Sequence, residues 1–300
     1  MAPGCATASI GNRDGGPDTA LPHSPPVPAT RRGTLTAVTA PACPFDRILV
    51  PARPAPDAER ALSVAVGLAL RTGVPLRLLS VAWPIDARIT RGFAAGPDEG
   101  VPPVEIERRV VGVGSVADAV VAEAEPGTLI CMASHGAYGP ARTLARTVAE
   151  EVIRTAREPV LLVGPHAVPE NSLGAGRRVV ACLDGSPGDD GTVTTARRWS
   201  RAFGLPLCLV HVAAAPDPAL ERRLHDIARS LGGEDGYRVL HDRHPARALA
   251  DLAATAAVAV FVMAPAGRAG WGRVLARSVT ASTVRRATAP VLAVPPRAPG

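Results

Sequence analysis

The chain contains two copies of one sequence unit. Shifting the sequence by 131 positions aligns residues 132–163 with residues 263–294, and 15 of these 32 positions are identical. The same shift aligns "GVPLRLLSVA" (Gly73–Ala82) with "GLPLCLVHVA" (Gly204–Ala213). Self-similarity at one fixed offset indicates repeated structural units. A length of 300 residues also suits about two domains. We therefore expect two domains of the same fold.

Within each copy, short apolar runs alternate with amphipathic stretches. Strands are predicted at Arg47–Val50, Pro75–Val81, Ile106–Val111, Thr128–Met132 and Pro159–Val163, and again at Arg178–Leu183, Pro206–Val212, Tyr237–His241, Ala257–Met263 and Pro290–Val294. Helices are predicted at Asp57–Arg71, Ser115–Glu125, Thr147–Arg157, Asp189–Phe203, Pro218–Leu231, Pro245–Ala256 and Ser278–Ala287. This alternation favours parallel sheets. The predicted fold class is α/β, with two tandem open parallel five-stranded sheets flanked by helices, in a Rossmann-like arrangement.

The domain boundaries follow from the repeat and from composition. Residues 1–44 contain eight Pro and five Gly without apolar periodicity, which predicts a disordered leader. The first domain is expected at residues 45–165 and the second at residues 178–296. The segment between them, residues 166–177 ("HAVPENSLGAGR"), is interpreted as a linker.

The composition argues against nucleic acid and membrane partners. All 33 basic residues are Arg, and no Arg cluster is interleaved with aromatic residues, so the net charge of +6 does not indicate a nucleic-acid surface. The longest apolar run, Ala256–Ala264, is far shorter than a membrane span. The five cysteines form no C-x-x-C pair, which favours a reduced, cytoplasmic setting.

A glycine-bearing loop follows the fourth predicted strand of each copy. The loops belong to "MASHGAYGPARTLARTVAEEV" (Met132–Val152) and "VMAPAGRAGWGRVLARSVTASTV" (Val262–Val284). A strand, a glycine loop and a helix start together suit an anion, because free N–H groups and the positive end of the helix dipole converge there. The alternative is a turn that needs glycine only for its geometry.

Both copies resemble the universal stress protein (UspA-like) family. The resemblance rests on "VVACLDGSP" (Val179–Pro187) and on the two closing segments, residues 132–163 and 263–294. It implies a five-stranded parallel fold of the adenine-nucleotide α-hydrolase-like type in each copy. It also implies pairing of the two domains through their last strands.

The resemblance supplies candidate nucleotide-binding residues. Family members that bind ATP carry G-x2-G-x9-G-[ST] after the fourth strand and an Asp at the end of the first strand. The second copy keeps Asp184, Gly267 and Ser278, but has Ala264 and Arg277 at the other two glycines. The first copy keeps Gly136 and Thr147, but has Ala133, Arg146 and, in place of the acid, Arg53.

The resemblance then implies a role for each residue of the second copy. Asp184 would accept hydrogen bonds from the ribose hydroxyls, and the backbone near Val212 would face the adenine. Gly267 and the N–H groups of Ser278 and Val279 would hold the phosphates of ATP, with Mg²⁺ bound alongside. Arg277, like Arg146, either contributes a charged fork to phosphate or is a solvated or interdomain residue. Because Arg53 cannot accept from ribose, the first copy is not expected to bind ATP in this way.

Three other patterns do not support a site. The G-x-G-x-x-A in "VVGVGSVADAVV" (Val110–Val121) follows a third strand, whereas a dinucleotide loop follows a first strand. "HDRH" (His241–His244) has no further metal ligand nearby in the sequence, and the adjacent Ser134 and His135 do not suit a triad. We therefore predict no catalytic residues and no metal ligands.

The sequence predicts a cytoplasmic, non-enzymatic stress-response module for binding or signalling. Its partners would be an adenine nucleotide in the second domain, its own other domain and, as a further option, a second copy of the chain. The alternatives left open are a structural or interaction protein that binds no nucleotide, and a slow ATPase.

Overall fold

The computed structural model describes residues 42–51, 56–81, 106–111, 115–134, 147–169, 174, 176–186, 188–231, 236–265 and 279–295. The strands are β1 (Arg47–Pro51), β2 (Leu76–Val81), β3 (Ile106–Val111), β4 (Thr128–Ala133), β5 (Val160–Val163), β6 (Arg178–Leu183), β7 (Leu207–Ala213), β8 (Gly236–His241), β9 (Val258–Met263) and β10 (Val291–Ala293). The helices are α1 (Pro56–Thr72), α3 (Val116–Glu123), α4 (Val148–Thr155), α5 (Asp189–Phe203), α6 (Pro218–Ser230), α7 (Pro245–Thr255) and α8 (Val279–Arg286). Each predicted strand and helix is therefore confirmed, with ends that shift by a few residues.

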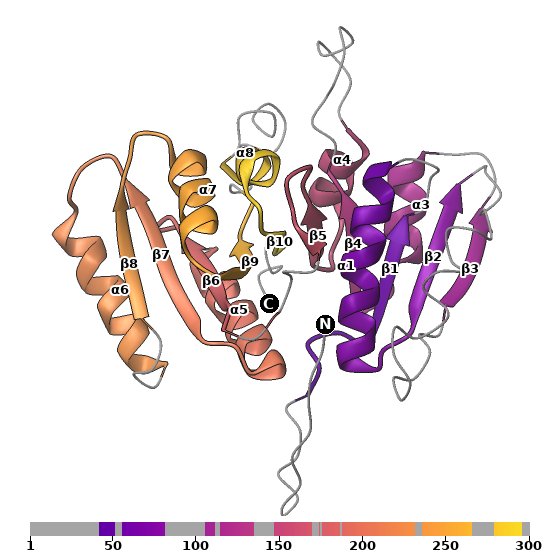
Figure 1. Cartoon of the computed structure of the whole chain (residues 1–300), viewed down its shortest axis with the longest axis horizontal. Coiled ribbons are helices and arrows are strands. Elements are labelled where there is room, and N and C mark those ends of the chain that lie inside the picture. The colour runs from indigo at the N-terminus through magenta and orange to yellow at the C-terminus, as the bar shows by residue number, and fades with distance from the viewer. Residues whose placement is uncertain are drawn as a thin grey trace, which may run out of the picture. The chain divides into compact units, whose positions relative to one another are not determined.

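The two repeats have the same strand order (Figure 1). In the first repeat the order is β3-β2-β1-β4-β5, and in the second it is β8-β7-β6-β9-β10. All neighbours within a repeat pair in parallel. The first strand of each repeat thus lies between the second and the fourth. Open parallel sheets bind ligands beyond the carboxyl ends of the strands where the order reverses, which here is between β1 and β4 and between β6 and β9.

The two five-stranded sheets join edge to edge into one ten-stranded sheet. β5 pairs with β10 in antiparallel orientation, with Leu161 opposite Leu292. The pairing of the last strands that the family resemblance implied is therefore present. The predicted boundaries at residues 165 and 178 are not tested by this arrangement and stay predictions, and residues 1–41 of the predicted leader lie outside the described residues.

Apolar side chains fill both faces of the sheet. Successive strand residues alternate between two buried clusters, so that Ile48 and Val50 belong to one and Leu49 to the other, as strand geometry requires. The first cluster also contains side chains of α1, α5 and α6, and the second contains side chains of α3, α4, α7 and α8. Each cluster draws on both repeats, so the repeats share their cores.

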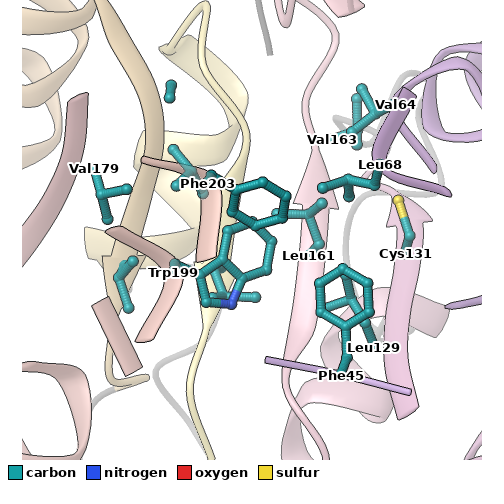
Figure 2. Close-up of a cluster of buried hydrophobic side chains, with 14 of the residues drawn as sticks. Phe45, Val64, Leu68, Leu129, Cys131, Leu161, Val163, Val179, Trp199 and Phe203 are labelled. Atoms are coloured by element: carbon teal, nitrogen blue, oxygen red, sulfur yellow. The ribbon is translucent and has the colours of Figure 1, made fainter. Parts of the chain in front are cut away.

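Aromatic side chains lie where the repeats meet on the α1–α5 face. Trp199 of α5 is 5.8 Å from Phe45 and 5.2 Å from Phe203, measured between ring centroids (Figure 2). Arg71 of α1 lies 5.8 Å above the Phe203 ring and donates a hydrogen bond to the Phe203 carbonyl. Only 3% of the residues are aromatic, and these three rings fill a volume between the repeats that the smaller side chains of Ala and Val would leave empty.

Backbone also meets backbone at this junction. A Cβ added to Gly164, directly after β5, would lie 1.9 Å from the carbonyl oxygen of Val284 in α8. Glycine is therefore required for the close approach of the two repeats at this point. Across the described residues, no helix is long and apolar enough to cross a membrane.

Candidate functional site

The second repeat has a cavity of about 130 Å³ at the carboxyl ends of β6, β7 and β9. It also reaches the first turns of α7 and α8. The lining residues are Cys182, Leu183, Asp184, Asp189, Val210, His211, Val212, Pro245, Leu249, Met263, Ala264, Val279 and Thr280. The cavity therefore lies at the reversal of strand order, where this type of sheet places ligands.

Most of the lining is apolar. Val210, Leu249 and Met263 are buried side chains of the core cluster on the α7–α8 face. Cys182 contributes a thiol whose pKa is raised by burial and, to a smaller extent, by the nearby Cys208. A thiol with a raised pKa stays protonated at neutral pH and acts as a small apolar group. These walls suit the flat apolar face of an aromatic ring.

The two carboxylates of the site lie on the loop between β6 and α5 and at the start of α5. Asp184 is exposed and follows β6 directly, and its Oδ1 accepts from the N–H of Ser186 at 3.0 Å. Gly185 has a φ of +85°, a backbone conformation that favours glycine. The Asp-Gly-Ser sequence therefore forms a local turn that presents a carboxylate at the rim of the cavity.

The side chain of Asp189, the first residue of α5, bonds the backbone of this loop. Its Oδ1 accepts from the N–H of Asp184 at 3.1 Å, and its Oδ2 accepts from the N–H of Gly185 at 3.0 Å. Burial raises the pKa of Asp189, while these two hydrogen bonds and the charge of Arg223 act in the opposite direction. Asp189 is thus a buried acid with a structural partner on each oxygen.

His211 joins the ends of β6 and β7. Its Nδ1 lies 2.8 Å from the carbonyl oxygen of Leu183. Because a carbonyl only accepts, Nδ1 carries the proton in this hydrogen bond, and Nε2 of a neutral ring is then an acceptor.

The predicted site residues fall into three groups according to where the structure places them. Asp184, Val212 and Val279 line the same cavity, although they are far apart in the sequence. Gly267, Arg277 and Ser278, with Gly136, Arg146 and Arg53 of the first repeat, lie outside the described residues. Thr147 is described, and it caps helix α4.

Ala264 shows how the exchange of a motif glycine is accommodated. It lines the cavity, and its Cβ lies 3.0 Å from the position that a Cβ on Gly188 would take. The methyl group therefore fills space beside the loop that carries Asp184, and the glycine at position 188 makes room for it.

Sequence reasoning missed Asp189 and Arg223. In the sequence, Asp189 is simply the first residue of a helix, where acidic residues are common because they complement the dipole. Arg223 is one of 33 basic residues and carries no pattern that distinguishes it. The one available signal was that the first repeat has Ala58 at the position of Asp189 and Arg53 at the position of Asp184.

Thr147 and Glu150 form a capping box at the start of α4. Thr147 Oγ1 accepts from the N–H of Glu150, and Glu150 Oε2 accepts from the N–H of Thr147, both at 3.2 Å. Replacing Thr147 by alanine should lower the free energy of unfolding by about 1 kcal/mol, measured by urea denaturation. Thr155→Ala is the control, because its hydroxyl only bonds back to the Glu151 carbonyl within the same helix and should matter little. Equal effects of the two changes would contradict the cap.

Comparison with known protein families identifies the family of the chain. The model of the universal stress protein family matches residues 86–164 and 214–295, more than half of the chain. The chain belongs to the universal stress protein family. Its tandem arrangement follows from the two matched regions together with the repeated strand order. Among curated proteins, no sequence matches the chain.

Solved structures share the fold over most of the chain. A universal stress protein from Archaeoglobus fulgidus DSM 4304 is 19% identical with a TM-score of 0.64, and the match covers 83% of this chain and 96% of that one. A putative universal stress protein from Pseudomonas aeruginosa UCBPP-PA14 is 17% identical with a TM-score of 0.56, covering 84% and 94%. The cytoplasmic domain of a prokaryotic cation chloride cotransporter is 15% identical with a TM-score of 0.51, covering 83% and 94%. At these identities the likeness concerns the fold.

Proposed function

We propose that the second repeat binds ATP or a related adenine nucleotide, and that the protein is a non-enzymatic, cytoplasmic module for stress-response binding or signalling. The observation that carries this proposal is the convergence of Asp184, Val212 and Val279 on one cavity. Each lies near the end of a different strand or at the start of a helix, and the family resemblance implies for each a contact with a different part of the nucleotide.

The cavity suits one end of a nucleotide better than the whole molecule. Its volume of about 130 Å³ is below the roughly 300–1,000 Å³ of ligand pockets. The apolar walls favour the adenine ring, and Asp184 at the rim favours the ribose hydroxyls. The phosphates would extend toward the start of α8, where Gly267, Arg277 and Ser278 are the predicted contacts and Mg²⁺ would accompany the triphosphate.

The first repeat is proposed to have a structural or regulatory role. At its α4 start the Glu150 carboxylate already accepts from the N–H of Thr147, which is the kind of donor that phosphate would need. A phosphate would also meet the like charge of Glu150. The equivalent residue of the second repeat is Ala281, which has no carboxylate to occupy that position.

A non-enzymatic role is favoured by the chemistry of the groups at the cavity. The chain has no lysine, so no lysine can stabilise a transferring phosphate as in P-loop enzymes. Asp189, the buried acid of the site, bonds two backbone N–H groups and is poorly placed to take a proton from water. The slow ATPase therefore stays an alternative without a base assigned to it.

Calorimetric titration with ATP, with and without Mg²⁺, tests the proposal. Asp184→Ala should weaken binding about 10- to 100-fold, because it removes a charged hydrogen-bond acceptor. Asp251→Ala is the matched control, an exposed acid on α7 that does not line the cavity, and it should leave the Kd unchanged.

Each alternative has its own outcome. Wild-type protein that binds no nucleotide, or binding that Asp184→Ala leaves unchanged, would contradict the proposal and favour the structural role. Release of phosphate from ATP above the buffer rate, lost in Asp184→Ala, would favour the ATPase.

A further inference from the structure

The loop that carries Asp184 is held through its backbone by one buried side chain. The two carboxylate oxygens of Asp189 accept from two successive N–H groups, those of Asp184 and Gly185, at 3.1 and 3.0 Å. Asp189 is 3% exposed. A buried ionised acceptor makes stronger hydrogen bonds than a neutral one, and two bonds to adjacent peptides fix both the position and the orientation of the loop.

Arg223 of α6 holds the same loop from its other side. Its Nη1 donates to the carbonyl oxygen of Gly185 at 3.2 Å, and its Nη2 lies 3.9 Å from Oδ2 of Asp189. The backbone of Gly185 is therefore bound on both sides, with its N–H donating to the Asp189 carboxylate and its carbonyl accepting from the Arg223 guanidinium. The guanidinium also offsets the charge of Asp189, which would otherwise oppose the neighbouring charge of Asp184.

This arrangement leaves Asp184 available to a ligand. Asp184 Oδ1 bonds the N–H of Ser186, and the described structure gives Oδ2 no hydrogen bond with the protein. The backbone of Asp184 is held by Asp189, so the carboxylate at the rim does not have to be ordered when a ligand binds. Fixing a binding group in advance lowers the entropic cost of association.

The sequence has an acid at the supporting position only in the repeat that also has the rim acid. The second repeat combines Asp184 with Asp189, whereas the first has Arg53 and Ala58 at the equivalent positions. At these two positions the acids are thus both present in the second repeat and both absent from the first, which links Asp189 to the role of Asp184.

We infer that Asp189 and Arg223 are positioning residues that hold the Asp184 carboxylate at the cavity for the hydroxyl groups of a ribose. This inference rests on the proposed nucleotide site. It assigns no contact between ligand and either positioning residue, and the effect of each is transmitted through the backbone of Asp184 and Gly185.

The test compares two ligands, ATP and 2′,3′-dideoxy-ATP, which lacks the ribose hydroxyls. Asp189→Asn replaces one acceptor oxygen by an amide that faces an N–H donor, and should weaken ATP binding about tenfold. It should leave the Kd for dideoxy-ATP almost unchanged. Arg223→Gln should have the same selectivity with a smaller effect, because its distance to Asp189 is 3.9 Å. Asp190→Asn, an exposed neighbour in the same first turn of α5, should affect neither ligand.

The double variant Asp184→Ala/Asp189→Asn should bind ATP no more weakly than Asp184→Ala alone. Once the Asp184 carboxylate has been removed, Asp189 has no binding group left to position, so the two losses are not additive. Additive losses, or equal losses for both ligands, would overturn the inference. Amide hydrogen exchange of the ligand-free protein separates the two proposals. Asp189→Asn should speed exchange at Asp184 and Gly185 about tenfold. If wild-type protein binds no nucleotide, the proposed function fails, and unchanged exchange in Asp189→Asn would show independently that Asp189 does not hold the loop.

Discussion

Replacing Trp199 by alanine should lower the free energy of unfolding by about 3–5 kcal/mol. Trp199 is 2% exposed and packs against Phe45 before β1 and Phe203 at the end of α5 (Figure 2). A rigid sheet on one side prevents the space from closing after the indole is removed. The loss should appear as a lower urea midpoint by circular dichroism.

Two controls define this effect as packing between the repeats. Trp199→Phe keeps an aromatic ring and should lose clearly less, and Tyr237→Ala removes a ring that is 39% exposed and should cost well under half as much. A double-mutant cycle with Phe45→Ala should give a coupling of about 0.5–1.5 kcal/mol for the ring pair. A loss below about 1 kcal/mol for Trp199→Ala would contradict the view that this side chain holds the repeats together.

Gly164→Ala should also destabilise the protein strongly, by about 3 kcal/mol. The added methyl group would lie 1.9 Å from the Val284 carbonyl oxygen and 3.0 Å from its carbonyl carbon. Backbone atoms of a packed helix cannot rotate away as a flexible side chain can, so β5 and α8 must separate. The measurement is again urea unfolding of the whole chain.

Gly67→Ala is the matched control for this change. Gly67 is an exposed residue within α1, and an added Cβ meets nothing within 4 Å. Alanine there should stabilise the protein by about 0.5–1 kcal/mol, because glycine is a poor helix residue. The opposite signs at positions 67 and 164 are the decisive result. Equal, small effects would mean that the repeats do not meet closely at Gly164.

The sequence predicted the local structure well because each element is coded locally. β9 reads as a continuous apolar run, and all six of its residues are buried. α6 begins with Asp217 as a cap and Pro218 at its first position, a standard start signal. The fixed offset between the copies then predicted that both would have the same strand order.

The candidate site was predicted only in part. Asp184, Val212 and Val279 all followed from the family resemblance, which implied contacts of these residues with ribose, adenine and phosphate. Asp189 and Arg223 were missed, because their roles depend on hydrogen bonds to backbone groups that come together only after α5 and α6 pack.

The sequence by itself determined the two α/β repeats and their family, because alternation, turns and motif residues are local properties. That the second repeat is the better candidate for a nucleotide stays a prediction. Only the tertiary structure decided how the repeats join, through β5 and β10 and through the rings around Trp199. It also decided which polar groups surround Asp184. Packing sets these features, since residues far apart in the chain become neighbours only when apolar faces with no other partner are buried against each other.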